Sequence, residues 1–246
     1  MISLVLIASS CAGLVDKTDK EALQKVRSVA IVGFTFDQQE ANSGKTLTDN
    51  LLGANDMGPM GKINVDVTES KIANYAYELA ALTFQSKLGF KVLPQAKTAA
   101  NAEVAKFYAA KDATFQTGVD PLMKQTYRYE AKGIPQAYYV HFASKEKLNA
   151  LAKSLGVDAI VLVRSKTRIA QSSVMGIGVG SISSVNDVSA LVYDPRTSDF
   201  IVVANVSGDP ISTKAARFMG FADAEEMNVQ AAESYNSALM KLIAKF

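Results

Sequence analysis

The chain has 246 residues, of which 48% are hydrophobic and 20% charged, a balance typical of a globular protein with a sizeable core, in one large domain or two small ones. Its 26 lysines and arginines against 24 acidic residues give a formal charge of +2, so charge gives no reason to expect nucleic-acid binding. A single cysteine excludes an internal disulfide, and after residue 11 no stretch approaches the roughly 18 to 20 apolar residues of a membrane-spanning helix.

The chain opens with an apolar run that ends at its only cysteine. Residues 2–8 (ISLVLIA) have about the length of the apolar part of a signal peptide, roughly 7–15 residues, and small residues then lead to Cys11. This stretch resembles a bacterial lipobox, which implies that residues 1–10 are a signal and that Cys11 becomes the lipidated first residue. Ala12 is similar to the residue that outer-membrane lipoproteins carry there, which implies an anchor at the periplasmic face of the outer membrane.

The pattern departs from a lipobox at two points. No lysine or arginine precedes Cys11, and Ala8 stands where a lipobox prefers leucine. A signal that begins upstream of Met1 accounts for the first departure. The alternative is a cytosolic protein whose buried first strand ends in an inert core cysteine. The polar residues that follow, within 11–27, predict a short tether or a first helix.

The first strand is expected within residues 26–36, which contain a continuous apolar stretch. The segment SGKT (residues 43–46) then has the ending of a phosphate-binding loop. That loop requires a glycine five residues before Gly44, where this chain has Gln39. We interpret the segment as a turn with an exposed lysine, and a nucleotide-binding enzyme is the alternative.

Apolar residues recur at helical spacing between Thr68 and Gly89, which predicts a helix. Its buried stripe would be Ile72, Tyr75, Leu79 and Leu82. A short strand is expected at 90–94, where Pro94 ends it. Two further helices are expected at 98–111 and 144–155.

Residues 105–142 are rich in aromatic side chains and hold eight of the chain's twenty phenylalanines and tyrosines. Glycines and prolines accompany them, which predicts a loop-rich excursion from the domain. Tyrosines are enriched in recognition surfaces, so the candidate partner-binding residues here are Tyr127, Tyr129, Tyr138 and Tyr139. The alternative is that they hold the excursion down over the sheet.

The only histidine, His141, has aromatic neighbours in the sequence, which favours a packed structural role. A catalytic triad would have to use His141, but the nucleophile-elbow sequence G-x-S-x-G is missing. A zinc site would find too few ligands in one histidine, one cysteine and scattered carboxylates. Carboxylates occur throughout the chain and no spacing singles out a catalytic pair, so paired-carboxylate chemistry stays open as an alternative. We expect no metal site and no cofactor.

Residues 157–165 form the second strongly apolar strand, and three strand-like runs follow it without a helix between them. These runs span 167–182, 187–193 and 200–206. The last two flank a turn with proline, serine and aspartate, which predicts an antiparallel hairpin.

The first of these runs contains three glycines, Gly176, Gly178 and Gly180, in alternation with apolar residues. A dinucleotide-binding loop has the spacing G-x-G-x-x-G and leads into a helix, which this run does not. Alternating glycines expose one face of a strand, so a partner can approach its backbone closely or the strand is weakly specified. We include the three glycines among the candidate partner-binding residues.

A long helix closes the chain at about 223–245, with Asp223 as its N-cap. The order of elements predicts a single α/β domain over 28–246. Its sheet would be mixed, parallel early and antiparallel late, and flanked by helices.

Several phrases of the sequence together resemble the envelope lipoproteins built on the TolB N-terminal-like domain. They are the lipobox-like start, SVAIVGF, KLGFKVLP, LGVDAIVLV and the hairpin VSALVYDPRTSDFIVVA. Relatives include the curli-secretion lipoprotein and the lipoprotein activators of penicillin-binding proteins. The resemblance spans about 28–93 and 144–246 and implies a non-enzymatic protein that binds partners, assembles or forms export channels. It carries over no functional residue, because no site motif of the family is matched.

We therefore expect a non-enzymatic, lipid-anchored periplasmic protein that binds a cell-envelope protein in assembly, secretion or cell-wall work, either as a monomer or as a homo-oligomer. A channel-forming oligomeric lipoprotein is a further alternative. It would need residues 167–184 to supply membrane strands, and this region is polar and rich in serine.

Overall fold

The structure is a computed structural model that describes residues 16–39, 68–69, 71–109, 126–171, 182–212 and 224–246. Lipidation at Cys11, the SGKT segment at 43–46 and the glycines Gly176, Gly178 and Gly180 lie outside these residues. They stay predictions, as do the nucleotide-binding and channel-forming alternatives that depend on them.

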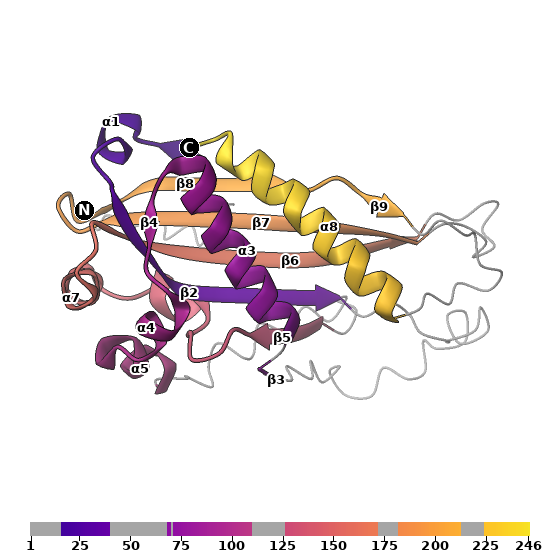
Figure 1. The fold of residues 1–246 in the computed structure, drawn as a ribbon, viewed down its shortest axis with the longest axis horizontal. Helices are drawn as coiled ribbons and strands as arrows, with labels where there is room; N and C mark the ends of the chain where they lie inside the picture. The colour runs from indigo at the N-terminus through magenta and orange to yellow at the C-terminus, as the bar shows by residue number, and fades with distance from the viewer. Residues whose placement is uncertain (1–15, 40–67, 70, 110–125, 172–181, 213–223) are drawn as a thin grey trace, which may run out of the picture.

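The described residues form a nine-stranded sheet (Figure 1). Its long strands are β2 (Ser28–Gln39), β6 (Ala159–Gln171), β7 (Ile182–Asp194) and β8 (Asp199–Ser207). The shorter strands are β1 (Lys17–Thr18), β3 (Thr68–Glu69), β4 (Lys91–Val92), β5 (Thr126–Glu130) and β9 (Ile211–Ser212). The strand order is β1-β8-β7-β6-β2-β5-β3, with β4 beside β2 and β9 beside β7.

The strand pairing confirms a mixed sheet. β2 runs parallel to β6 and β4, whereas β7 is antiparallel to both of its neighbours, β6 and β8. The predicted hairpin is β7–β8, with its turn after Asp194. β5, which the sequence did not predict, adds an antiparallel strand on the other side of β2.

Helices cover both faces of this sheet. α3 (Lys71–Leu88) and the long C-terminal α8 (Ala224–Ile243) lie side by side on one face and cross the strands diagonally in Figure 1. α6 (Ala137–His141) and α7 (Lys145–Leu155) cover the other face. The remaining described helices are α1 (Lys20–Leu23), α4 (Gln95–Ala99) and α5 (Ala102–Ala109).

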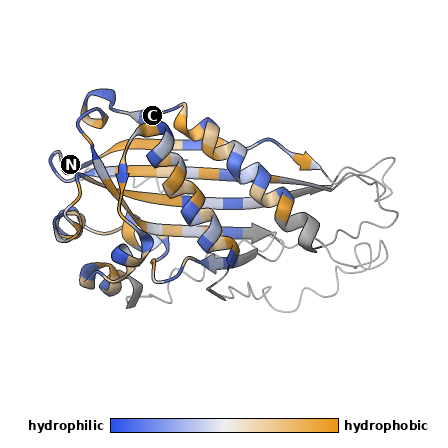
Figure 2. Ribbon diagram, viewed as in Figure 1, coloured by the Kyte–Doolittle hydropathy of each residue, from blue (hydrophilic) through white to orange (hydrophobic). Residues whose placement is uncertain are grey.

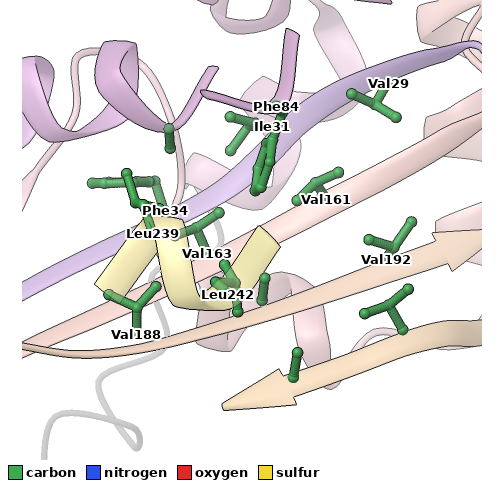
Figure 3. Packing of buried hydrophobic residues seen from close by; sticks show 14 of the residues in the cluster. Val29, Ile31, Phe34, Phe84, Val161, Val163, Val188, Val192, Leu239 and Leu242 are labelled. Atoms are coloured by element: carbon green, nitrogen blue, oxygen red, sulfur yellow. The ribbon is translucent and has the colours of Figure 1, made fainter. Parts of the chain in front are cut away.

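The core consists of two apolar layers, one on each face of the sheet. The layer under α3 and α8 includes Ile31 and Phe34 of β2 with Phe84 of α3 (Figure 3). The layer under α6 and α7 takes the alternate residues of the same strand, Ala30 and Val32. Both faces of β2 are thus buried, as its continuous apolar run predicts. The strands become more polar toward the end of the sheet where β2 and β6 finish and β7 begins (Figure 2).

The predicted buried stripe of α3 is correct for Ile72 and Leu79, which are partly buried against the core, and wrong for its other two residues. Tyr75 and Leu82 are 54% and 62% exposed. The residues that face the sheet are Ala73, Ala76, Tyr77, Ala80, Thr83 and Phe84. Small alanine side chains let the helix lie close to the strands, and Tyr77 and Phe84 fill the space beside them.

Several element boundaries differ from the sequence prediction. Residues 17–23, where a tether or a first helix was expected, form β1 and the helix α1, and Ala22 and Leu23 are buried in the core. The helix expected at 98–111 is split into α4 and α5. The strand-like run that begins at residue 167 is a continuation of β6 in the described residues up to Gln171.

Candidate functional site

The structure separates the four candidate tyrosines. Tyr127 and Tyr129 belong to β5, where they pair with Gln38 and Phe36 of β2. Tyr129 packs against the apolar layer under α3 and α8. Tyr138 and Tyr139 belong to α6 on the opposite face, and both are partly exposed. β5 is a strand of the sheet and not part of a loop, so the excursion at 105–142 is in part integral to the fold.

Tyr138 is the centre of an aromatic and cationic cluster. The guanidinium carbon of Arg164 lies 3.8 Å from the centroid of the Tyr138 ring, and that of Arg128 lies 5.2 Å from it. Arg164 also donates a hydrogen bond to the Tyr138 hydroxyl. Guanidinium groups over a ring face are attracted by its quadrupole. These contacts fix the orientation of Tyr138.

The two arginines differ in how their charges are compensated. Arg128 donates to both carboxylate oxygens of the buried Asp37, at 2.7 and 3.0 Å. Burial alone would lower the pKa of Arg128, but Asp37 outweighs it and raises that pKa above its ordinary value. Arg164 makes no ion pair with any carboxylate of the described residues. Within the described part of the chain, Arg164 is therefore the cation of the cluster that has no carboxylate partner.

Buried amide and carboxylate groups support Arg128 from below. Gln136 accepts a hydrogen bond from Arg128 at 3.5 Å and donates one to Glu130 at 3.3 Å. Gln136 and Glu130 are almost completely buried. A buried polar network that is hydrogen-bonded in this way holds its side chains in one arrangement. The positions of Arg128 and Tyr138 are therefore set before any ligand binds.

A close approach of α6 to β2 positions the cluster. The strand has an irregularity in its pairing with β6 between Ile31 and Gly33. Beyond it the Phe34 N–H donates to the Pro135 carbonyl at 2.9 Å. The Ala137 N–H donates to the Thr35 hydroxyl at 3.0 Å. A Cβ atom on Gly33 would lie 2.8 Å from the Ala137 Cα, so only glycine permits this approach.

The outer side of α6 is aromatic. The Phe142 side chain is 64% exposed, and its ring stacks on His141 with 4.8 Å between centroids. His141 also meets the edge of Phe200 at 5.5 Å, so it is packed against aromatic rings as predicted. Burial, followed by the positive charge of Arg164, lowers the pKa of His141 below its ordinary value. Both effects favour the neutral imidazole.

We call Arg128, Tyr138, His141, Phe142 and Arg164 the α6 cluster. The sequence pointed to Tyr138 and to the aromatic stretch but not to the arginines. In the sequence, Arg164 is noticeable only as a charged residue at the end of the apolar run VDAIVLV. Its contact with Tyr138, which lies 26 positions away along the chain, could not be predicted from that run.

The described residues contain no group of three histidine, cysteine, aspartate or glutamate side chains that could hold a metal ion. Among the helices that the structure describes, none is long and apolar enough to cross a membrane.

Comparison with known proteins yields distant structural likenesses. No protein-family model and no curated protein matches the chain. The lipoprotein GNA1162 from Neisseria meningitidis is 13% identical, with a TM-score of 0.37, over 89% of this chain and 99% of that one. The C-terminal domain of LpoB from Salmonella enterica is 11% identical, with a TM-score of 0.32, over 76% of this chain and 90% of that one. At TM-scores this low the likenesses carry no argument about function.

Proposed function

We propose that this chain is a non-catalytic envelope lipoprotein, anchored through Cys11 at the periplasmic face of the outer membrane, and that its α6 cluster binds a cell-envelope protein. The observation that carries the proposal is Arg164, which stacks on Tyr138 and has no carboxylate partner among the described residues. One helical turn after Tyr138 lies the exposed Phe142, whose N–H donates to the Tyr138 carbonyl. Arginine and tyrosine dominate the binding energy of many protein interfaces.

The charges of the cluster favour an acidic partner segment. A carboxylate of the partner that reached Arg164 would form a charge-assisted hydrogen bond in a partly desolvated place. The neighbouring ring of Phe142 would take an apolar side chain of the same segment. The partner that fits is therefore a protein segment in which a carboxylate lies beside an apolar or aromatic residue.

The ionisable groups of the cluster support binding over catalysis. Asp37 is engaged by Arg128, and the Tyr138 hydroxyl is engaged by Arg164. His141 is packed between rings, and its lowered pKa disfavours the protonated form. A general acid or base must reach a substrate with its proton-carrying atom, whereas the Asp37 and Tyr138 oxygens are engaged by arginines and the His141 Nδ1 is buried.

Site-directed photo-crosslinking in the native host tests the proposal. A photoreactive amino acid replaces Phe142, and in a control it replaces Met240, which is 45% exposed on α8 at the opposite face. We expect an envelope-protein adduct from position 142 only, identified by mass spectrometry, and its loss when Arg164→Gln is added. The assignment would be overturned by equal adduct yields at both positions, or by an adduct yield at position 142 that Arg164→Gln does not change.

The anchor has its own test. The intact mass of the protein from its native upstream DNA should show a chain that begins at an acylated Cys11 and sediments with outer membranes. A Cys11→Ser chain should lose both properties. A soluble wild-type chain that keeps residues 1–10 would disprove the anchor. Partner binding by the α6 cluster would still be tested by the crosslinking experiment.

A further inference from the structure

The segment that follows Cys11 is fastened to one end of the sheet. Asp16 accepts a hydrogen bond from the Asn205 N–H at 2.9 Å and forms an ion pair with Lys245. The Asp19 N–H donates to the Ile201 carbonyl at 2.8 Å. The Thr18 hydroxyl donates to the Lys245 carbonyl at 2.9 Å. The described chain is therefore bound to β8 and to the end of α8 from Asp16 onward.

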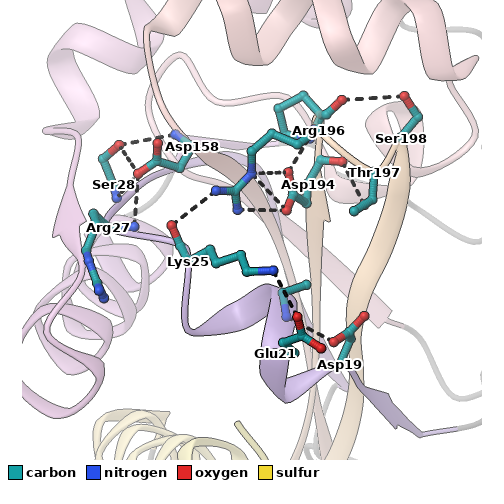
Figure 4. Close-up of polar contacts among 12 residues, drawn as sticks. Asp19, Glu21, Lys25, Arg27, Ser28, Asp158, Asp194, Arg196, Thr197 and Ser198 are labelled. Atoms are coloured by element: carbon teal, nitrogen blue, oxygen red, sulfur yellow. Dashed lines mark hydrogen bonds and ion pairs between the residues drawn. The ribbon is translucent and has the colours of Figure 1, made fainter.

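A second set of contacts holds the rest of this segment, as Figure 4 shows. The Asp158 carboxylate accepts from the N–H groups of Arg27 and Ser28 at 2.9 and 2.8 Å, and from the Ser28 hydroxyl at 3.0 Å. Arg196 pairs with Asp194 and donates to the Lys25 carbonyl at 3.2 Å. Asp158 and Asp194 are thus engaged in internal contacts, and the exposed Glu21, which lines the same groove as Lys20 and Arg27, pairs with Lys25.

Several cations at the same end are not engaged in this way. Lys20, Arg27, Lys87 and Lys91 are exposed, and their side chains form no ion pair with any described residue. Lys20 and Arg27 line a groove of about 690 Å³ together with Leu88 and Phe246. Lys87 precedes Leu88 in the last turn of α3. The Lys91 N–H donates to the Arg27 carbonyl at 2.8 Å, which places the two residues side by side.

Figure 1 shows that α1, the last turn of α3 and the end of α8 gather at one end of the sheet. We call the surface formed there by Lys20, Arg27, Lys87 and Lys91 the basic end. The α6 cluster belongs to the opposite face of the sheet from α3 and α8. A change to the basic end therefore leaves the contacts of the α6 cluster in place.

The chain length between Cys11 and the fold limits how far the basic end can lie from an anchor. Four residues, 12–15, separate Cys11 from Asp16 in the sequence. Even a fully extended chain spans at most about 18 Å over these five steps. A lipidated Cys11 lies at the membrane surface, and charge attraction to anionic lipids acts over about one Debye length, roughly 8–10 Å.

We infer that the basic end is a membrane-contact surface that binds anionic phospholipid headgroups and holds the domain in a fixed orientation on the bilayer. The inference rests on the proposed function in one respect, the lipid at Cys11 that brings this end to the membrane. Each cation near an anionic surface is expected to raise the membrane partition coefficient about fivefold. Removal of three cations should therefore lower it about a hundredfold.

Vesicle sedimentation of the full chain with Cys11→Ser tests the inference without the lipid. The probes are vesicles of phosphatidylcholine alone and of phosphatidylcholine with phosphatidylglycerol. The test variant adds Lys20→Gln, Arg27→Gln and Lys87→Gln. The matched control adds Lys71→Gln, Lys97→Gln and Lys132→Gln, which neutralise three exposed lysines elsewhere, the first of them at the other end of α3. Urea unfolding of each variant checks that the fold is kept.

We expect the parent chain to bind more strongly to vesicles with phosphatidylglycerol than to vesicles of phosphatidylcholine alone. The test variant, and the parent chain in high salt, should lose this preference. The control variant should keep it. Equal losses in both variants, or parent-chain binding that ignores phosphatidylglycerol, would overturn the inference. The two proposals fail separately, because crosslinking at position 142 does not depend on Lys20, Arg27 or Lys87. Intact crosslinking beside absent vesicle selectivity would refute only the membrane surface, and the reverse result would refute only the α6 cluster.

Discussion

Substitution of Gly33 by alanine tests how the fold positions the α6 cluster. The added Cβ would lie 2.8 Å from the Ala137 Cα and 3.0 Å from a terminal methyl carbon of Leu162. The methyl group can turn away, but the Cα belongs to the backbone of α6. The helix must therefore move outward, and Tyr138 moves with it. We expect Gly33→Ala to lower both the free energy of unfolding and the partner binding of the α6 cluster.

The size of the effect follows from the contact distances. Overpacking of a well-packed interior costs about 1–3 kcal/mol. A cost of about 2 kcal/mol would lower the urea midpoint by roughly 1 M, because m-values for domains of this kind are about 1–3 kcal/mol/M. The assays are urea unfolding, with an unchanged m-value, and crosslink yield at position 142.

A second glycine supplies the matched control. Gly89 follows α3 with φ +70° and has no atom within 4 Å of an added Cβ. Alanine there is strained by about 1 kcal/mol through its backbone alone, and no part of α6 has to move. Gly33→Ala should reduce crosslinking and Gly89→Ala should not. Unchanged stability in Gly33→Ala, or equal loss of crosslinking in both variants, would refute the reasoning.

Three other predictions concern single side chains. Burial lowers the pKa of His141, the chain's only histidine. The contribution of the neutral imidazole to the free energy of unfolding should therefore be fully present above pH 6.5, the ordinary pKa, and be lost as the pH falls through the lower pKa of the folded protein. Urea midpoints measured against pH should show this slope, and His141→Gln should abolish it. Burial alone would raise the pKa of Asp158, but its hydrogen bonds lower it. Asp158→Ala should therefore lower the free energy of unfolding by about 1 kcal/mol, after allowance for solvent screening. This difference should vanish as the pH falls below 3.8, the ordinary pKa, and protonates the carboxylate. Tyr77→Phe leaves the buried Ile31 carbonyl without its hydrogen bond at 3.1 Å and should cost about 1–2 kcal/mol, whereas Leu82→Ala should change the unfolding midpoint hardly at all; the opposite ranking would contradict the observed register of α3.

The strands that form the core were predictable because their composition is decisive. The apolar runs in β2 and β6 fit only strands buried on both faces, and the turn after Asp194 marks the hairpin. β5 was missed because its sequence, TYRYE, is polar and aromatic in alternation and has no apolar run. Its place beside β2 depends on pairing with residues about 90 positions away, which local pattern does not encode.

The face of α3 was misjudged for a different reason. Large apolar residues at i, i+3, i+7 and i+10 suggested the buried stripe, but close packing selected the alanines. Composition ranks residues by hydrophobicity, whereas the distance between helix and sheet decides which sizes fit. In the same way, the aromatic stretch around Tyr138 was visible in the sequence. The positive charge over the Tyr138 ring comes from Arg164 of β6, which local sequence around Tyr138 does not reveal.

The short β1 has a consequence for a crowded surface. Its two residues pair with Val202 and Val203, and together with Asp16, which accepts from the Asn205 N–H, they cover the middle of the outer edge of β8. Uncovered strand edges join neighbouring molecules into larger sheets. Proteins held in the plane of a membrane meet one another far more often than proteins free in solution. If Cys11 carries the lipid as proposed, the residues nearest the lipid also shorten the strand edge through which neighbouring copies could pair.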